Sequence, residues 1–312
     1  MLKSFRLALA LTVITFPLAT VAFADGLKVV ASFSIIGDFA RQVGGNRIEL
    51  TTLVGPDGDA HVYEPKPTDA AAMAQAQVVL VNGLHFEGFL QRLTETSGST
   101  AVVVELTKGV EPIAMKEDHA EHEGEEAHAA DEHGHGDIDP HAFQSVANAE
   151  IYVKNIADAF CAADAAGCDT YRTNAAAYTE QLYALDAELK ATVAAIPADK
   201  RTIITSHDAF GYFEHAYGLT FLAPEGISTE AEASAADVAA LIRQVRGDKA
   251  SAIFVENVTN PRLIEQIATE TGIKVGGTLY SDALSQEGGP AATYVDLMRH
   301  NMATIKGAVL GS

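Results

Sequence analysis

Three histidines and one aspartate in separate loops have side chains that could bind one metal ion together. Each follows a strand-like run or a rigid turn: His61, His141, His207 and Asp282. Zinc in proteins takes about four ligands, and imidazole nitrogens and carboxylate oxygens are among those it prefers. A single loop histidine is more often a surface residue, so spacing alone does not select these three among the 11 histidines of the chain.

Short β-branched runs alternate with amphipathic segments along most of the chain. The alternation fills residues 25–168, is interrupted by a helical pattern over 169–197 that ends at Pro197, and resumes over 198–312. It predicts an α/β fold with two parallel-sheet domains joined by a long connecting helix. Ligands of parallel sheets bind beyond the carboxyl ends of the strands, so we expect the metal site in the cleft between the domains.

Residues 116–137 differ in composition from the rest of the first domain. They contain nine carboxylates, almost no large apolar side chain, and five histidines: His119, His122, His128, His133 and His135. Such a segment cannot bury enough surface to order itself, so we expect a flexible loop. Its imidazoles could be auxiliary zinc ligands that bind weakly, because flexible ligands lose entropy on each capture. The alternative is a solvated linker.

The first 24 residues are typical of a cleaved secretory signal peptide. Lys3 and Arg6 precede an almost wholly apolar run over residues 7–21, and small residues flank a cleavage point near Ala24-Asp25. The run is shorter than the ~20 residues of a membrane-spanning helix, and Pro17 interrupts it. No cysteine follows it to carry a lipid. We therefore expect a mature chain that is free in the periplasm.

Charge and cysteine content narrow the possible partners and the redox setting. The formal charge of −21 becomes −23 when Lys3 and Arg6 leave with the signal peptide, which repels nucleic acid and anionic lipid and concentrates cations. Cys161 and Cys168 are the only cysteines. In an oxidising compartment they could close a small loop, so we expect a disulfide at a helix–helix turn. A metal-binding pair is the alternative, but the spacing does not favour it.

Five motifs give the chain a resemblance to a known family. They are GPDGDAHVYEPKPTDA, DPH at 139–141, TSHDAFGYFEHAYGL, STEAEASAADVAALI and IFVENVTNPRLIEQIATETGIKVGGTLYSDALS. The chain resembles the metal-binding subunits of zinc and manganese ABC importers, in which a rigid long helix joins two α/β domains. The resemblance implies that His61, His141, His207 and Asp282 are the metal ligands. It also implies that Glu256 is a carboxylate that orients a ligating imidazole, although a solvated strand end is the simpler interpretation of Glu256.

The resemblance bears on which metal is bound. Manganese members tend to have a carboxylate at the third ligand position, whereas this chain has His207, and imidazole suits zinc better than manganese. Some members use water or a carboxylate near the first loop as the fourth ligand, which makes Asp59 and Glu64 alternatives to Asp282. After DPH the family often continues with Trp, Asp and Pro, but this chain has Phe143, Ser145 and Val146.

These observations favour a periplasmic high-affinity zinc-binding protein that captures Zn(II) and delivers it to an ABC-transporter permease. A zinc chaperone or buffer built around the histidine-rich segment is one alternative, and a manganese-binding member of the same family is another. The chain has neither an HExxH nor a GxSxG motif, so we expect no enzyme activity and no catalytic residues. Expected partners are the permease and a periplasmic zinc chaperone that donates to the histidine-rich segment. We expect a monomer and no nucleic-acid binding.

Overall fold

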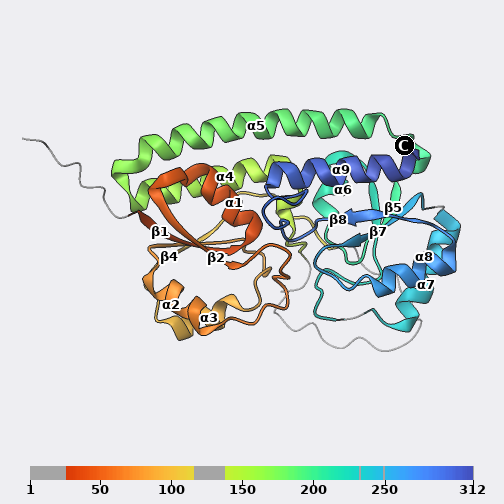
Figure 1. The fold of residues 1–312 in the computed structure, drawn as a ribbon, viewed down its shortest axis with the longest axis horizontal. Coiled ribbons are helices and arrows are strands. Elements are labelled where there is room, and N and C mark those ends of the chain that lie inside the picture. Colours follow the sequence, from red (N-terminus) through yellow and green to blue (C-terminus); the bar gives the residue numbers. More distant parts are fainter. Residues whose placement is uncertain (1–25, 116–137, 232, 249, 312) are drawn as a thin grey trace, which may run out of the picture.

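The computed structural model describes residues 26–115, 138–231, 233–248 and 250–311. They form two α/β lobes, here called the N-lobe and the C-lobe, and three long helices that pack along them (Figure 1). The long helices are α4 (Val146–Ala163), α5 (Cys168–Ala194) and α9 (Tyr294–Leu310). Helix α5 runs along both lobes, with α4 beneath it over the N-lobe and α9 beneath it over the C-lobe (Figure 1).

A parallel four-stranded sheet with the strand order β2-β1-β3-β4 forms the N-lobe. Its strands are β1 (Leu27–Phe33), β2 (Ile48–Val54), β3 (Val78–Val81) and β4 (Val102–Glu105). The helices between successive strands are α1 (Ser34–Gly44), α2 (Pro67–Gln75) and α3 (Leu90–Ser97). The central strand β3 is wholly buried, as expected for an apolar run covered on both faces.

The C-lobe repeats this topology with the strand order β6-β5-β7-β8. Its strands are β5 (Thr202–Ile204), β6 (Thr220–Leu222), β7 (Ala252–Glu256) and β8 (Val275–Leu279). Between them lie α6 (Gly211–Tyr217), α7 (Ala235–Asp248) and α8 (Arg262–Thr271). In each sheet the chain leaves the first strand to one side and then crosses to the other. This places a topological switch point at the carboxyl ends of the first and third strands.

Apolar residues at helical spacing attach α5 to the rest of the molecule. Its buried positions recur every three or four residues over 27 residues: Tyr171, Ala175, Tyr178, Leu182, Leu185, Leu189 and Val193. This is the pattern of a helix with one face on a core and the other in solvent. The main hydrophobic core continues from the N-lobe through α4, α5 and α9 into the C-lobe, while a smaller cluster lies under α7 and α8. The two lobes therefore share a core along their helical side.

The predicted fold class is confirmed: two parallel α/β lobes are joined by a long helix. The expected domain limits at residues 168 and 197 stay a prediction. Cys161 and Cys168 form a disulfide at the turn between α4 and α5. The signal segment 1–24 and the five histidines of 116–137 lie outside the described residues.

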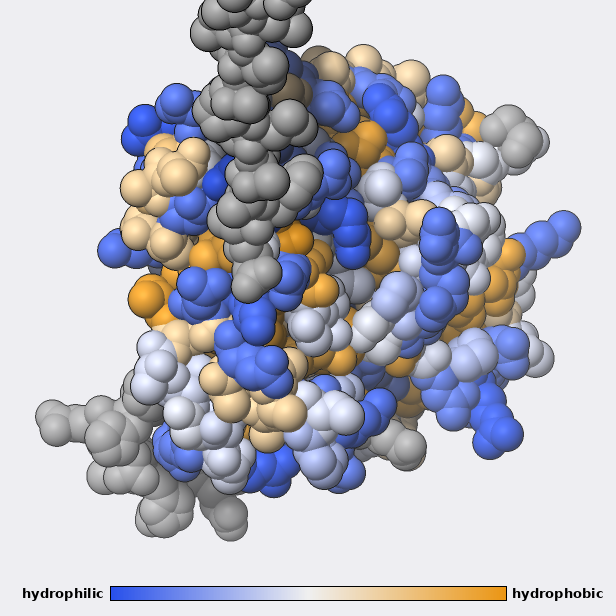
Figure 2. Space-filling view, turned by 60° about the vertical axis from the view of Figure 1, so that its left-hand side comes forward, coloured by the Kyte–Doolittle hydropathy of each residue, from blue (hydrophilic) through white to orange (hydrophobic). Residues whose placement is uncertain are grey.

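On the face in Figure 2, hydrophilic side chains predominate, and hydrophobic ones gather in smaller patches between them. In the described parts of the chain, none of the helices has the length and apolar character needed to cross a bilayer.

Candidate metal centre

The four side chains singled out in the sequence come from loops of both lobes. His61 follows β2, and His141 immediately precedes a 3₁₀ turn over Ala142–Gln144 that leads into α4. His207 follows β5 and Asp282 follows β8, both at carboxyl ends of C-lobe strands. The rule that ligands bind beyond the carboxyl ends of parallel strands therefore holds for this site.

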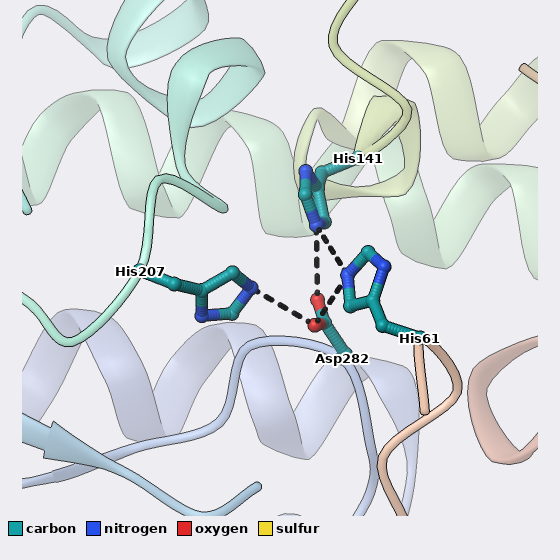
Figure 3. Close-up of side chains that lie close together, drawn as sticks. All are labelled: His61, His141, His207 and Asp282. Carbon is teal, nitrogen blue, oxygen red and sulfur yellow. Dashed lines mark hydrogen bonds and ion pairs between the residues drawn. The ribbon is translucent and has the colours of Figure 1, made fainter. Parts of the chain in front are cut away.

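The candidate ligand atoms converge on one point between the lobes (Figure 3). Asp282 Oδ2 lies 3.1 Å from His207 Nε2 and 3.4 Å from His61 Nε2, and Asp282 Oδ1 lies 3.6 Å from His141 Nε2. The Nε2 atoms of His61 and His141 are 3.2 Å apart. Ligands about 2.0–2.1 Å from a tetrahedral ion are separated by roughly 3.3 Å, so the cluster has the dimensions of a tetrahedral metal site.

The cluster is closed off from water. His141, His207 and Asp282 have no exposed surface, and His61 retains 7%. The ring of Phe86 packs edge-on against both His61 and His141, with centroids 4.7 and 5.6 Å away. Placing three imidazoles and a carboxylate in such an environment is costly unless they bind a partner, and a divalent cation satisfies all four donors at once.

Glu256 fixes the orientation of His207. Its Oε2 lies 2.6 Å from His207 Nδ1, and its Oε1 accepts backbone hydrogen bonds from Ser206 at 2.7 Å and His207 at 3.0 Å. A proton on Nδ1 therefore faces the carboxylate and leaves Nε2 with its lone pair toward the cluster. Burial lowers the pKa of His207, but Glu256 and Asp282 outweigh it and raise that pKa well above its usual value.

A second carboxylate plays the same part for His141. Asp139 Oδ1 accepts a hydrogen bond from the His141 backbone N–H at 2.9 Å and lies 2.8 Å from its Nδ1. The other oxygen, Oδ2, lies against Gly211 at the start of α6, where a Cβ would clash with it. Gly211 thus lets the C-lobe approach the carboxylate that orients an N-lobe imidazole.

Asp282 is the anionic centre of the cluster. Burial raises the pKa of this carboxyl, but the imidazoles of His141 and His207 have the stronger combined effect and hold it well below its usual value. The loop around it is fixed from both lobes, since Ser281 O accepts a hydrogen bond from Gln144 Nε2 at 2.7 Å and Leu284 N donates to Ser34 Oγ at 2.9 Å. Asp282 is therefore ionised and held in place.

The alternatives for the fourth ligand lie elsewhere. Asp59 accepts hydrogen bonds from the His61 backbone and from Thr229 Oγ1, and Glu64 is exposed. Neither belongs to the group of donor atoms that lie within 4.8 Å of one another. In the described geometry, Asp282 is the carboxylate that faces all three imidazoles (Figure 3).

Sequence reasoning missed part of the supporting shell. In the sequence Asp139 stands out only as part of the DPH motif, although its position two residues before His141 is a local signal for side-chain contact. Asn82 has no such local signal in the sequence. It donates its side-chain N–H to Pro140 O at 2.8 Å and accepts from Tyr152 OH, which fixes the turn that carries His141.

Comparison with known proteins agrees with this geometry. Residues 29–308 match the family described as ZnuA, zinc-uptake complex component A, periplasmic. The chain belongs to this family. Membership identifies it as a metal-binding protein of metal uptake that works outside the cytoplasm, and not as an enzyme.

Proteins that are similar to this chain are named for different metals. The manganese-binding lipoprotein MntA of Halalkalibacterium halodurans is 33% identical over 280 residues, 90% of this chain and 87% of that protein. The iron-binding protein YfeA of Yersinia pestis is 31% identical over 310 residues, 96% and 95% of the two chains. The periplasmic zinc-binding protein TroA of Treponema pallidum has a structure with a TM-score of 0.81 at 28% identity, covering 90% of this chain and 98% of that one. The relatives therefore leave the choice of metal open.

Proposed function

We propose that this chain is the periplasmic zinc-binding protein of an ABC importer. It captures Zn(II) with His61, His141, His207 and Asp282 and delivers it to the membrane permease. The observation that carries the proposal is the buried cluster of three imidazole nitrogens and one carboxylate, whose spacing suits a tetrahedral ion. The absence of exposed surface on three of the four side chains suits capture and not chemistry on a metal-bound water.

The donor set supports zinc over manganese. Manganese prefers carboxylate, carbonyl and water oxygens in octahedral sites, whereas three imidazoles and a single carboxylate suit zinc. Zinc also binds nitrogen and oxygen sites more tightly than manganese or iron(II) in the general order of divalent affinities. Glu256 and Asp139, which face the Nδ1 atoms of two imidazoles, increase the basicity of these ligands.

Manganese is the second candidate, and one specific observation favours it. Relatives that share about a third of their residues with this chain are named for manganese, and a neighbour from Candidatus Liberibacter asiaticus has been solved with bound manganese at a TM-score of 0.77 and 30% identity. That neighbour has also been solved with cadmium, whose ligand preferences lie closer to those of zinc.

We infer cleavage of the signal peptide near Ala24-Asp25, a monomeric mature protein, and domains over 25–168 and 198–312 joined by the helix of 169–197. The histidines of 116–137 serve as auxiliary, low-affinity ligands that receive zinc, including zinc from a periplasmic chaperone. The strongly negative charge supports this role because it raises the local concentration of cations.

Metal competition on the mature protein tests the proposal. Metal-free protein is titrated with zinc and manganese in the presence of chelators, and the bound ion is located by anomalous scattering at the zinc edge. We expect one tightly bound zinc that manganese displaces only at large excess. The variant with His61, His141 and His207 all changed to Ala should lose this zinc. Tight binding that survives the triple change would move the function to segment 116–137, and tighter binding of manganese would reassign the cargo.

A further inference from the structure

One carboxylate outside the ligand set connects the two lobes beside the cluster. Asp59 lies in the loop after β2, and its Oδ1 accepts a hydrogen bond from the backbone N–H of His61 at 2.9 Å. Its other oxygen, Oδ2, accepts a hydrogen bond from Thr229 Oγ1 at 2.6 Å, although the two residues are 170 positions apart in sequence. A single side chain thus ties the backbone of an N-lobe ligand to a segment of the C-lobe.

The C-lobe segment 225–230, which carries Thr229, is itself attached to the loop of a second ligand. Two backbone hydrogen bonds flank His207: Glu225 N donates to Ser206 O at 3.3 Å, and Asp208 N donates to Gly226 O at 3.1 Å. Between them, His207 forms a short parallel bridge with this segment. A path therefore runs from the backbone of His61 through the hydrogen bonds of Asp59 to Thr229, then along the chain to residues 225 and 226, which bond to the neighbours of His207 on both sides.

The residues of the bond between Asp59 and Thr229 are more accessible to solvent than the metal ligands. His207 and Asp282 are fully buried, whereas Asp59 and Thr229 are both partly exposed at the side of the cluster. A hydrogen bond from a hydroxyl to an ionised carboxylate is stronger than one between neutral groups. The bond between Thr229 and Asp59 therefore helps to hold the two lobes together. Because it is accessible, it can also be broken without any contact with the ion.

We propose that Asp59 and Thr229 form a latch that keeps the lobes closed and slows the escape of the captured ion. Asp59 is a positioning residue, because it acts on the ion only through the backbone of His61. The inference rests on the proposed function and deepens its capture step. It predicts that the latch changes how fast the metal leaves far more than how fast it arrives, because the latch forms only once the lobes have closed.

Zinc release from Thr229→Val tests the latch, since valine has nearly the shape of threonine but no hydroxyl to donate. Dissociation is followed by transfer of zinc to an excess of a strong chelator. We expect release about tenfold faster than in the wild type, from the loss of one charge-assisted hydrogen bond. Thr229→Ser should restore slow release. Adding Thr229→Val to Asp59→Ala should change little further, because both changes remove the same bond.

Gln286→Ala supplies a matched control for the loss of a bond between lobes. Gln286 Nε2 donates to Pro56 O at 3.2 Å, so it joins the C-lobe to the same loop, but the bond does not lead to His61. This variant should release zinc at the wild-type rate, and the thermal midpoint of the metal-free proteins should be alike. Wild-type release from Thr229→Val would overturn the latch while leaving the proposed function intact. Equal acceleration by Gln286→Ala would overturn the specific role of Asp59, and a wild type without tight zinc binding would overturn both proposals.

Discussion

Replacing Glu256 with Gln should weaken zinc binding although Glu256 is not itself a ligand. Its Oε1 accepts two backbone N–H groups, from Ser206 and His207, so the oxygen of a glutamine would have to remain at that place. The amide NH₂ would then face His207 Nδ1, where Glu256 Oε2 now lies 2.6 Å away. Because an NH₂ donates, Nδ1 would become the acceptor, and the proton would move to Nε2, the nitrogen that must bind the ion.

The size of the effect follows from this forced change of tautomer. Loss of a group that orients a metal ligand typically lowers metal affinity by about 10- to 100-fold. That range corresponds to roughly 1.4–2.7 kcal/mol of binding free energy. If the amide instead turned over, its NH₂ would face the two backbone donors, and two buried N–H groups would lose their acceptor at a cost of about 1–3 kcal/mol each. Both arrangements therefore weaken the site or the fold around it.

Competition with a chelator of known affinity at pH 7.5 measures the change, alongside thermal unfolding of the metal-free protein. Glu265→Gln provides the matched control, because Glu265 is an exposed glutamate of the same lobe. It should bind zinc like the wild type. Zinc affinity of Glu256→Gln within threefold of the wild type would refute the argument that the tautomer of His207 is set by this carboxylate.

Four further predictions follow from the structure. Gly211→Ala should lower zinc affinity about tenfold in the same competition assay, because the new Cβ would clash with Asp139 Oδ2 and shift the carboxylate whose Oδ1 contacts His141 Nδ1. Gly247→Ala, where a Cβ meets nothing within 4 Å, should bind normally. Zinc affinity should rise by up to about tenfold per pH unit and should keep rising above pH ~6.5. The reason is the raised pKa of His207, because its proton must leave before Nε2 can bind the ion. A plateau at pH 6.5 would contradict this. Protonation of His207 also contributes to the stability of the metal-free protein. This contribution is fully present below pH ~6.5 and is lost as the pH rises through the raised pKa, which urea unfolding at pH 6 and pH 9 checks. Changing Cys161 and Cys168 together to Ser should lower the free energy of unfolding in urea by about 2 kcal/mol, as expected for a short closed loop, and should leave zinc affinity unchanged. An unchanged unfolding midpoint would show that the disulfide does not stabilise the fold.

Sequence patterns predicted the regular elements well where local physics decides them. The β-branched and apolar runs over Ile48–Val54 and Val78–Val81, which turn residues bound, are strands in the structure. The residue pattern over 87–96 predicts a helix, whereas α3 is Leu90–Ser97. Glu87 explains the difference: its buried carboxylate accepts hydrogen bonds from Ser32 Oγ and from the Asn82 backbone, both at 2.6 Å, and this holds the preceding residues in a non-helical turn.

The supporting contacts of the candidate site depend on the tertiary fold and could not be predicted in the same way. Asp139 is two residues from His141 in sequence, but its contact with Gly211 exists only because α6 of the C-lobe packs against the DPH turn. The same holds for Thr229, which reaches Asp59 across 170 positions. Hydrophobic periodicity specifies which face of an element is buried, and it contains no information on which polar atoms then meet.

The four converging side chains come from loops distributed from residue 61 to residue 282, so no partial fold contains the site. Metal affinity should therefore be coupled to completion of folding. By mass action, a ligand present at about 1,000 times its dissociation constant adds roughly 4 kcal/mol to the stability of the state that binds it. A chain exported before it folds would thus carry no cargo, and metal loading outside the cytoplasm would favour the chains that have folded correctly.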